Sequence, residues 1–230
     1  SGQFASYHVY PSYPAYLNFF SDWSACGLDN PLEFVDENGD LKTFDVYLGV
    51  DRGIFEGDFA IAVVGELNDN KNQEVIIKAI ASLKDECPGL KGVFMGRGEK
   101  KEYLEELCRQ LNADERIRFL GYRNDVNRIL SACDLGVSAS IREGLGLNII
   151  EEMASGLPIV ASVNRGHKDI MTEDSGILVQ ATSIDGFAEA ILTYYKSFEK
   201  CEATSKNNFE RCKQFDVEVV KPLLLSIIEG

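Results

Sequence analysis

The sequence predicts an α/β protein built on a Rossmann-like, doubly wound parallel sheet, and two features of its patterning support this. From about residue 58 onward, short apolar runs alternate with amphipathic stretches in which apolar residues recur at helical spacing. The apolar runs also lack the in-and-out alternation of a half-exposed strand, which indicates strands covered by helices on both faces. Repeats of this kind favour a doubly wound sheet.

The expected strands are six apolar runs: residues 59–64, 90–95, 117–120, 135–138, 158–161 and 176–179. Four expected helices lie between them: residues 72–87, 100–111, 125–133 and 147–155. The first of these helices carries four apolar residues close to one face, namely Val75, Ile76, Ile80 and Leu83. After Ile184 the pattern is helical throughout, with segments at residues 186–198, about 204–212 and 217–228. We therefore expect a helical C-terminus.

The first 41 residues differ from the rest of the chain in composition. They hold a dense group of aromatic residues: Tyr7, Tyr10, Tyr13, Tyr16, Phe19, Phe20 and Trp23. An acidic stretch rich in turn-forming residues follows at 36–40. We therefore place a boundary near Leu41, between a short aromatic N-terminal extension at residues 1–41 and a main domain at residues 42–230. Amphipathic aromatics at this density favour an arm that packs over an exposed surface.

Composition argues against several classes of function. The 23 basic and 37 acidic residues give a formal net charge of −14, whereas a nucleic-acid-binding surface usually carries a basic stripe, so we expect no nucleic-acid partner. The six cysteines show no Cys-x-x-Cys spacing and the chain has two histidines, which argues against a structural zinc site. Scattered thiols without a signal-peptide pattern favour a cytoplasmic protein. No apolar run approaches the roughly 20 residues that span a bilayer.

The most informative stretch runs from Ser140 to Pro158. It begins just past an expected strand, passes through a glycine-containing turn and continues as a helix. In an open α/β sheet this is the carboxyl end of a strand, where ligands bind. The turn residues are Gly144, Leu145, Gly146 and Leu147. Their backbone N–H groups are expected to be the unpaired donors of a helix N-terminus, which suits a diphosphate.

Two glutamates flank this turn. Glu143 precedes it, and Glu151 lies eight residues further along, about two helical turns and near the same side. Carboxylates in these places suit sugar hydroxyls, one on a hexose and one on a ribose. The alternative is that Glu151 and Glu152 form a solvated helix face and that Glu143 is a loop acid, since glutamates are mostly exposed.

The stretch from Glu143 to Pro158, EGLGLNIIEEMASGLP, resembles the donor-binding signature of family 4 (group 1) retaining glycosyltransferases with the GT-B fold. Further segments resemble parts of the same family in consistent order across residues 42–230: 49–55 the start of the C-terminal domain, 65–72 the first phosphate loop, 96–99 the turn after the next strand, and 119–126 the loop beside the base. Residues 165–169 have counterparts in the members that build polysaccharides. The resemblance identifies the chain as the C-terminal, nucleotide-sugar-binding domain of such an enzyme.

The resemblance implies a role for each site residue. Glu143 becomes the catalytic-site contact to the donor sugar, Glu151 the contact to the ribose, and Lys71 the contact to the diphosphate. Main chain near Tyr122 and Arg123 holds the base. The implied donor is a nucleoside-diphosphate sugar, UDP-linked, and the implied reaction is retaining transfer to a polysaccharide or lipid-linked acceptor without metal or cofactor. Lys71 also has an argument of its own, because a cation before a helix N-terminus opposes the helix dipole unless an anion sits there. The alternative is a solvated lysine beside Asp69.

Two departures keep other functions open. Many family members carry arginine where this sequence has Glu66, and 41 residues are too few for the acceptor-binding N-terminal domain, so we expect the chain to be incomplete and inactive alone. The full enzyme is compatible with a peripheral position at the inner face of the membrane. A non-catalytic module that binds a nucleotide or a partner is the first alternative. A glycoside hydrolase fragment, which rests on residues 4–20 alone, is the second. For His167, a structural and a catalytic role both remain open.

Overall fold

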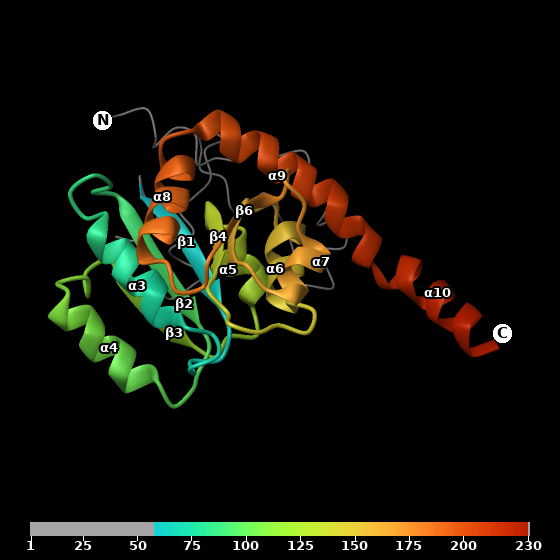
Figure 1. Ribbon diagram of the computed structural model, residues 1–230, viewed down its shortest axis with the longest axis horizontal. Coiled ribbons are helices and arrows are strands. Elements are labelled where there is room, and N and C mark those ends of the chain that lie inside the picture. The colour runs from blue at the N-terminus through green and yellow to red at the C-terminus, as the bar shows by residue number, and fades with distance from the viewer. Residues whose placement is uncertain (1–57, 230) are drawn as a thin grey trace, which may run out of the picture. The chain divides into compact units, whose positions relative to one another are not determined.

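The computed structural model describes residues 58–229 (Figure 1). The expectations for residues 1–57, including the aromatic extension, the boundary near Leu41 and the segment 49–55, lie outside the described residues and remain predictions. Side chains are described up to Pro222 and again at Leu225 and Ser226.

Six parallel strands form one sheet in the order β3-β2-β1-β4-β5-β6. The strands are β1 (Phe59–Val64), β2 (Leu90–Met95), β3 (Ile117–Gly121), β4 (Leu135–Ser138), β5 (Ile159–Ser162) and β6 (Gly176–Val179). The sequence prediction of a Rossmann-like parallel sheet is confirmed, and β5 begins one residue later than expected. The residues of β4 and β5 are buried throughout, as strands covered on both faces must be.

The helices are α3 (Gln73–Ser82), α4 (Lys101–Gln110), α5 (Val126–Leu130), α6 (Leu147–Ala154), α7 (Arg165–Ile170), α8 (Ile184–Tyr195), α9 (Phe198–Cys212), the 3₁₀ helix η3 (Lys213–Phe215) and α10 (Val217–Glu229). α3 ends at Ser82, five residues before the expected Cys87. The sequence pattern did not show α7, whose six residues are too few for a clear period. α9 begins at Phe198 instead of about residue 204. The Ser197 side chain caps this start, because it accepts a hydrogen bond from Lys200 N.

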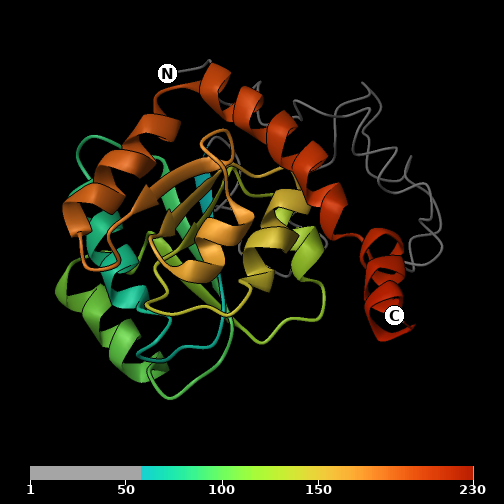
Figure 2. The same cartoon turned by 45° about the vertical axis from the view of Figure 1, so that its right-hand side comes forward.

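The strand order reverses between β1 and β4. Because crossovers between parallel strands are right-handed, the helices that lead toward β3 and those that lead toward β6 cover opposite faces of the sheet, an arrangement that can be followed in Figure 2. α3 packs against α4 and α8, whereas α6 packs against α5, α7 and α9. All six carboxyl ends lie at one end of the sheet, and the strand order reverses between β1 and β4. In open α/β sheets the loops that follow the strands at such a point are the usual place for a ligand.

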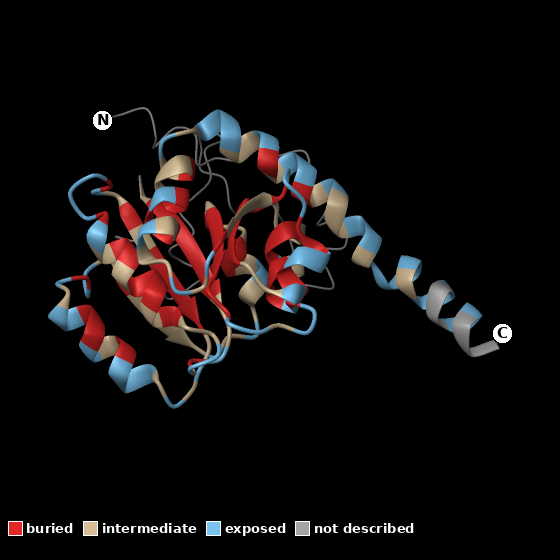
Figure 3. Cartoon of the chain, viewed as in Figure 1, coloured by how far each residue is buried: buried red, intermediate tan, exposed pale blue. Residues whose placement is uncertain are grey.

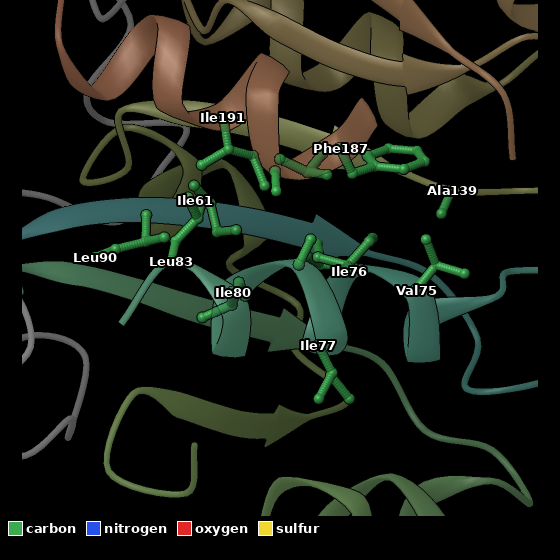
Figure 4. Packing of buried hydrophobic residues seen from close by; sticks show 14 of the residues in the cluster. Ile61, Val75, Ile76, Ile77, Ile80, Leu83, Leu90, Ala139, Phe187 and Ile191 are labelled. Atoms are coloured by element: carbon green, nitrogen blue, oxygen red, sulfur yellow. The ribbon is translucent and has the colours of Figure 1, made fainter. Parts of the chain in front are cut away.

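Apolar side chains from β1, α3 and α8 fix this edge in place. Ile61 and Ile76 pack with Phe187 and Ile191 in one buried cluster (Figure 4). The face predicted for α3 is buried, as are the strands behind it (Figure 3). Interiors of this density hold their backbone rigidly, so the loops at the carboxyl edge start from fixed points.

Candidate functional site

The loops after β1 and β4 are joined through Asn70. Its carbonyl accepts a hydrogen bond from Ile141 N at 2.8 Å. Its side-chain amide donates to Arg142 O at 3.0 Å, and its side-chain oxygen accepts from Arg142 N at 3.2 Å. These bonds link residues 71 and 72 positions apart at the place where the strand order reverses. Sequence reasoning missed Asn70, although the Asn-rich turn 68–72 signals a structured loop.

Lys71 and Glu143 form an ion pair between the same two loops. Both side chains are largely covered, at 20% and 14% exposure, which shields the pair from solvent. The Lys71 side chain lies across Gly65, where an added Cβ would approach its Cε to 3.1 Å. The sequence-predicted sugar contact and the sequence-predicted diphosphate contact therefore touch each other.

The alternative placement of Lys71 beside Asp69 is wrong, because Asp69 pairs with Lys100 instead. Lys71 does precede the N-terminus of α3, as the sequence argument assumed, and the anion that it meets is the Glu143 carboxylate. Burial by itself raises the pKa of Glu143, but hydrogen bonds from Lys71 and Ser140 and the charge of Lys71 hold that pKa below its ordinary value. Glu143 is therefore ionised at neutral pH.

The turn before α6 presents free backbone donors. Gly146, the residue before the first turn of α6, adopts the left-handed conformation with φ 51°, which glycine accepts without strain. Among the described residues, the N–H groups of Gly144, Leu145, Gly146 and Leu147 have no hydrogen-bond partner. Orphan N–H groups at the positive end of a helix dipole attract an anion.

The two adjacent glutamates of α6 lie in opposite surroundings. Glu151 is exposed, and desolvation by its neighbours raises the pKa of its carboxyl. Glu152 is fully buried, and neither of its carboxylate oxygens has a hydrogen-bond partner among the described residues. The alternative in which both form a solvated face is therefore wrong for Glu152. Its carboxylate fits against β4 because Gly136 has no side chain there: an added Cβ would overlap the Glu152 oxygens.

Glu152→Gln is expected to gain stability over the wild type as pH rises. Burial, reinforced by the charge of Glu151, raises the pKa of Glu152 well above its ordinary value. The folded state thus holds a proton that the unfolded state releases, so wild-type stability falls as pH rises above the unfolded-state pKa. The difference in unfolding free energy between the variant and the wild type should grow by about 1.4 kcal/mol per pH unit in that window. Urea unfolding from pH 5 to 8 measures it, with exposed Glu189→Gln as control; a pH-independent difference contradicts it.

The glycines after β2 serve close packing. An added Cβ at Gly96 or Gly98 would overlap the carbonyl oxygens of Gly65 and Leu67 respectively. Gly96 N donates to Gly121 O at 2.8 Å, and Gly65 N donates to Met95 O at 2.9 Å. The loops after β1, β2 and β3 are thereby held close together.

Tyr122 and Arg123 lie on the loop after β3. The Tyr122 ring is 67% exposed, and the Arg97 guanidinium sits over it at 4.6 Å from the centroid. Arg123 forms a bidentate ion pair with Asp125 at 2.7 and 2.8 Å, which raises the pKa of Arg123 and lowers that of Asp125. The Arg123 side chain is therefore engaged within its own loop, whereas Tyr122 is exposed beside Arg97.

Comparison with known proteins identifies the family. The family model described as "Glycosyl transferases group 1" matches residues 50–211, more than half of the chain. The chain belongs to the group 1 glycosyl transferases. This group 1 glycosyl transferase chain is 35% identical over 165 residues to the putative glycosyltransferase EpsD of Bacillus subtilis (strain 168). The match covers 71% of this chain and 43% of EpsD.

A second relative and a solved structure show which fold the chain has and how much of each protein it spans. Over 158 residues the chain is 32% identical to the UDP-Gal:alpha-D-GlcNAc-diphosphoundecaprenol alpha-1,3-galactosyltransferase of Escherichia coli. This match covers 67% of this chain and 39% of that enzyme. The crystal structure of Anabaena HepE in complex with UDP-glucose matches with a TM-score of 0.73 at 24% identity, over 80% of this chain and 51% of HepE. These comparisons confirm the GT-B type of fold, and the chain spans roughly half or less of each protein.

Within residues 58–229, no three His, Cys, Asp or Glu side chains gather as they would to hold a metal ion. In the same range, no helix is long and apolar enough to cross a membrane.

Of the sequence-predicted site residues, Lys71 and Glu143 are in contact, the turn 144–147 and Glu151 belong to the same strand-to-helix unit, and Tyr122 and Arg123 lie on the loop after β3.

Proposed function

We propose that this group 1 glycosyl transferase chain binds a UDP-linked sugar as the donor-binding part of a retaining glycosyltransferase. The observation that carries the proposal is the arrangement of side chains and backbone on the loops after β1 and β4. One cation, one carboxylate and a row of free N–H groups converge at the end of the sheet where α/β folds bind ligands. That combination suits a diphosphate joined to a hydroxyl-rich sugar.

Each residue then has one role. The turn 144–147 and Lys71 hold the diphosphate, Glu143 accepts hydrogen bonds from the donor sugar, and Glu151 accepts them from the ribose. Main chain at Tyr122 and Arg123 holds the uracil. The name of the Escherichia coli relative specifies a UDP-sugar donor, and HepE was crystallised with UDP-glucose, which supports UDP over other nucleotides.

The acceptor half of the enzyme belongs to a separate N-terminal domain. Matches that span 43% and 39% of two relatives support this. Transfer by positioning requires donor and acceptor to be held together, so this chain alone is inactive or nearly so. We propose a polysaccharide or lipid-linked acceptor on the cytoplasmic side of the membrane, and a reaction that uses no metal ion.

Stabilisation by UDP or a UDP-sugar in the presence of EDTA is the first expected result. Ligand at 100 times its dissociation constant adds about 2.7 kcal/mol to the stability of the folded state, and 1 kcal/mol moves the Tm of a chain of this size by about 2–4 °C. A thermal-shift screen with UDP, UDP-glucose and UDP-N-acetylglucosamine, with ADP and GDP as comparisons, makes the measurement. If none of them raises Tm at millimolar concentration, the donor-binding proposal fails.

A binding module without catalysis is the second candidate, and Glu66 favours it. The Glu66 side chain is exposed and accepts a hydrogen bond from Asn68 Nδ2 at 3.0 Å, so an acid stands where the family resemblance places a phosphate-neutralising arginine. A sugar-transfer assay with and without an added N-terminal domain separates the two candidates, since only the transferase gains activity from the added domain.

A further inference from the structure

A buried polar cluster lies at the carboxyl ends of β4 and β5, between the sheet and the turn that carries Glu143. We call it the polar floor, and its members are Ser138, Ser140, Ser162, Asn164 and His167. Ser140, Ser162 and His167 are fully buried. Polar groups are costly to bury without partners, so their arrangement has to satisfy many hydrogen bonds at once.

The polar floor fastens the backbone of Ser140, three residues before Glu143. Ser162 Oγ donates to the Ser140 carbonyl, and Asn164 Nδ2 donates to the same carbonyl at 3.0 Å. A hydrogen bond from the Ser140 side chain in turn helps to lower the pKa of Glu143. The segment after β5 therefore reaches the Glu143 carboxylate through a single intermediate residue.

His167 fixes the other end of the turn. Its backbone N–H donates to Asn164 Oδ1 at 3.0 Å, and its Nδ1 lies 2.8 Å from the Ser162 carbonyl. Nδ1 also lies 3.0 Å from Asn164 Nδ2. Nε2 has no partner within the described part of the chain. The ring edge that carries Nε2 lies against Gly146, where an added Cβ would meet Cδ2 at 3.2 Å and Nε2 at 3.6 Å.

Gly166 of α7 lies against the backbone of Glu143. An added Cβ there would lie 2.8 Å from the Glu143 carbonyl oxygen and 2.9 Å from Glu143 Cβ. The first turn of α7 therefore packs directly on the Glu143 backbone, while the His167 ring packs under Gly146. The Arg165-Gly166-His167 segment, whose role the sequence left open, supports both ends of the turn.

We propose that Asn164 and His167 are positioning residues that hold the Glu143 carboxylate for the donor sugar. This inference rests on the proposed function. In it, the segment after β5 sets how accurately the Glu143 carboxylate is placed for the donor sugar. Two contacts to the nucleotide have supports of their own, since Asn70 fastens the Lys71 loop and Glu151 belongs to the body of α6. A site held within a fraction of an ångström by such supporting contacts binds its ligand without a reorganisation cost.

The test compares Asn164→Ala with Asn208→Ala in the 230-residue chain. Both side-chain amides bridge two acceptors, but Asn208 donates to Leu157 O at 2.7 Å and Ser175 O at 2.9 Å, at the amino ends of β5 and β6. Carboxyl ¹³C NMR follows the titration of Glu143, assigned from its absence in Glu143→Gln. Calorimetry measures the affinities for UDP and for whichever UDP-sugar most stabilises the wild type.

Asn164→Ala should raise the pKa of Glu143 and weaken the UDP-sugar by roughly tenfold, the loss of about one charged hydrogen bond, without weakening UDP. Asn208→Ala should lower Tm and leave both readouts unchanged. His167→Gln should also raise the pKa of Glu143, but it should weaken UDP as well as the UDP-sugar, because the His167 ring packs under Gly146 of the turn that holds the diphosphate. Ser162→Ala, which removes only a hydroxyl that donates to the same Ser140 carbonyl, supplies the test should Asn164→Ala fail to fold. An unchanged Glu143 pKa together with an unchanged ratio of UDP-sugar to UDP affinity overturns the proposal. A wild type that binds no nucleotide overturns the proposed function instead, and the pKa readout still decides whether the polar floor holds Glu143.

Discussion

Replacement of Glu151 by glutamine is expected to weaken UDP and a UDP-sugar alike, by roughly ten- to a hundred-fold. The side chain is exposed on α6, about one turn beyond Leu147, the last of the free N–H groups. A carboxylate there can accept hydrogen bonds from both ribose hydroxyls. The loss of a hydrogen bond to a charged group costs about 1.5–3 kcal/mol, which gives that range of affinity. Because every ribonucleotide carries the ribose, the attached sugar makes no difference to the loss.

Calorimetry with both ligands at fixed ionic strength makes this measurement. Glu189→Gln, an exposed acid on α8, removes the same charge elsewhere and serves as the control. Glu152→Gln cannot serve, because that side chain is buried against β4 and its replacement changes stability. A Glu151→Gln variant that binds UDP as tightly as the wild type shows that the ribose contact lies elsewhere.

Glu143→Gln is expected to change the two ligands in opposite directions. The UDP-sugar should bind roughly tenfold more weakly, because the carboxylate that accepts from the sugar hydroxyls is gone. UDP should bind roughly fivefold more tightly, because a like charge near the diphosphate costs on the order of 1 kcal/mol and the Lys71 ammonium no longer has that partner. The ion pair with Lys71 is the basis for the second expectation.

The same calorimetric titrations decide this prediction, and each protein serves as its own reference for the ratio of the two affinities. Should both affinities fall by one common factor, Glu143 does not distinguish the sugar from the nucleotide. If the prediction holds, the ion pair also favours substrate over product. When a UDP-sugar binds, its sugar hydroxyls replace Lys71 as hydrogen-bond donors to Glu143. When UDP binds, the Glu143 carboxylate has no such donors and lies beside the phosphates.

The strands and the position of the site could be predicted because they depend on local pattern and on topology alone. Apolar runs such as Phe59–Val64 and Leu135–Ser138 are buried on both faces whatever their neighbours, and they appeared where expected. The carboxyl ends of parallel strands share one edge, so Lys71 after β1 and Glu143 after β4 had to lie near each other once the order reversed between them.

Contacts between distant residues could not be predicted in this way. Asn70 meets Arg142, and Asn164 meets Ser140, through loops whose conformations depend on the whole fold. No periodic pattern marks such residues, since each is one polar side chain in a turn. His167 stood alone in the sequence, and its role became readable only when its ring was found under Gly146.

By itself, then, the sequence determined the alternating strands and helices, the glycine turn before α6 and the family to which the chain belongs. Only the tertiary structure decided that Lys71 and Glu143 neutralise each other and that Glu151 faces solvent while Glu152 does not. The physical reason is that the side of a helix that becomes buried depends on the surface it meets. Gly136 of β4 leaves the space that the Glu152 carboxyl fills, and no feature of the α6 sequence records that space.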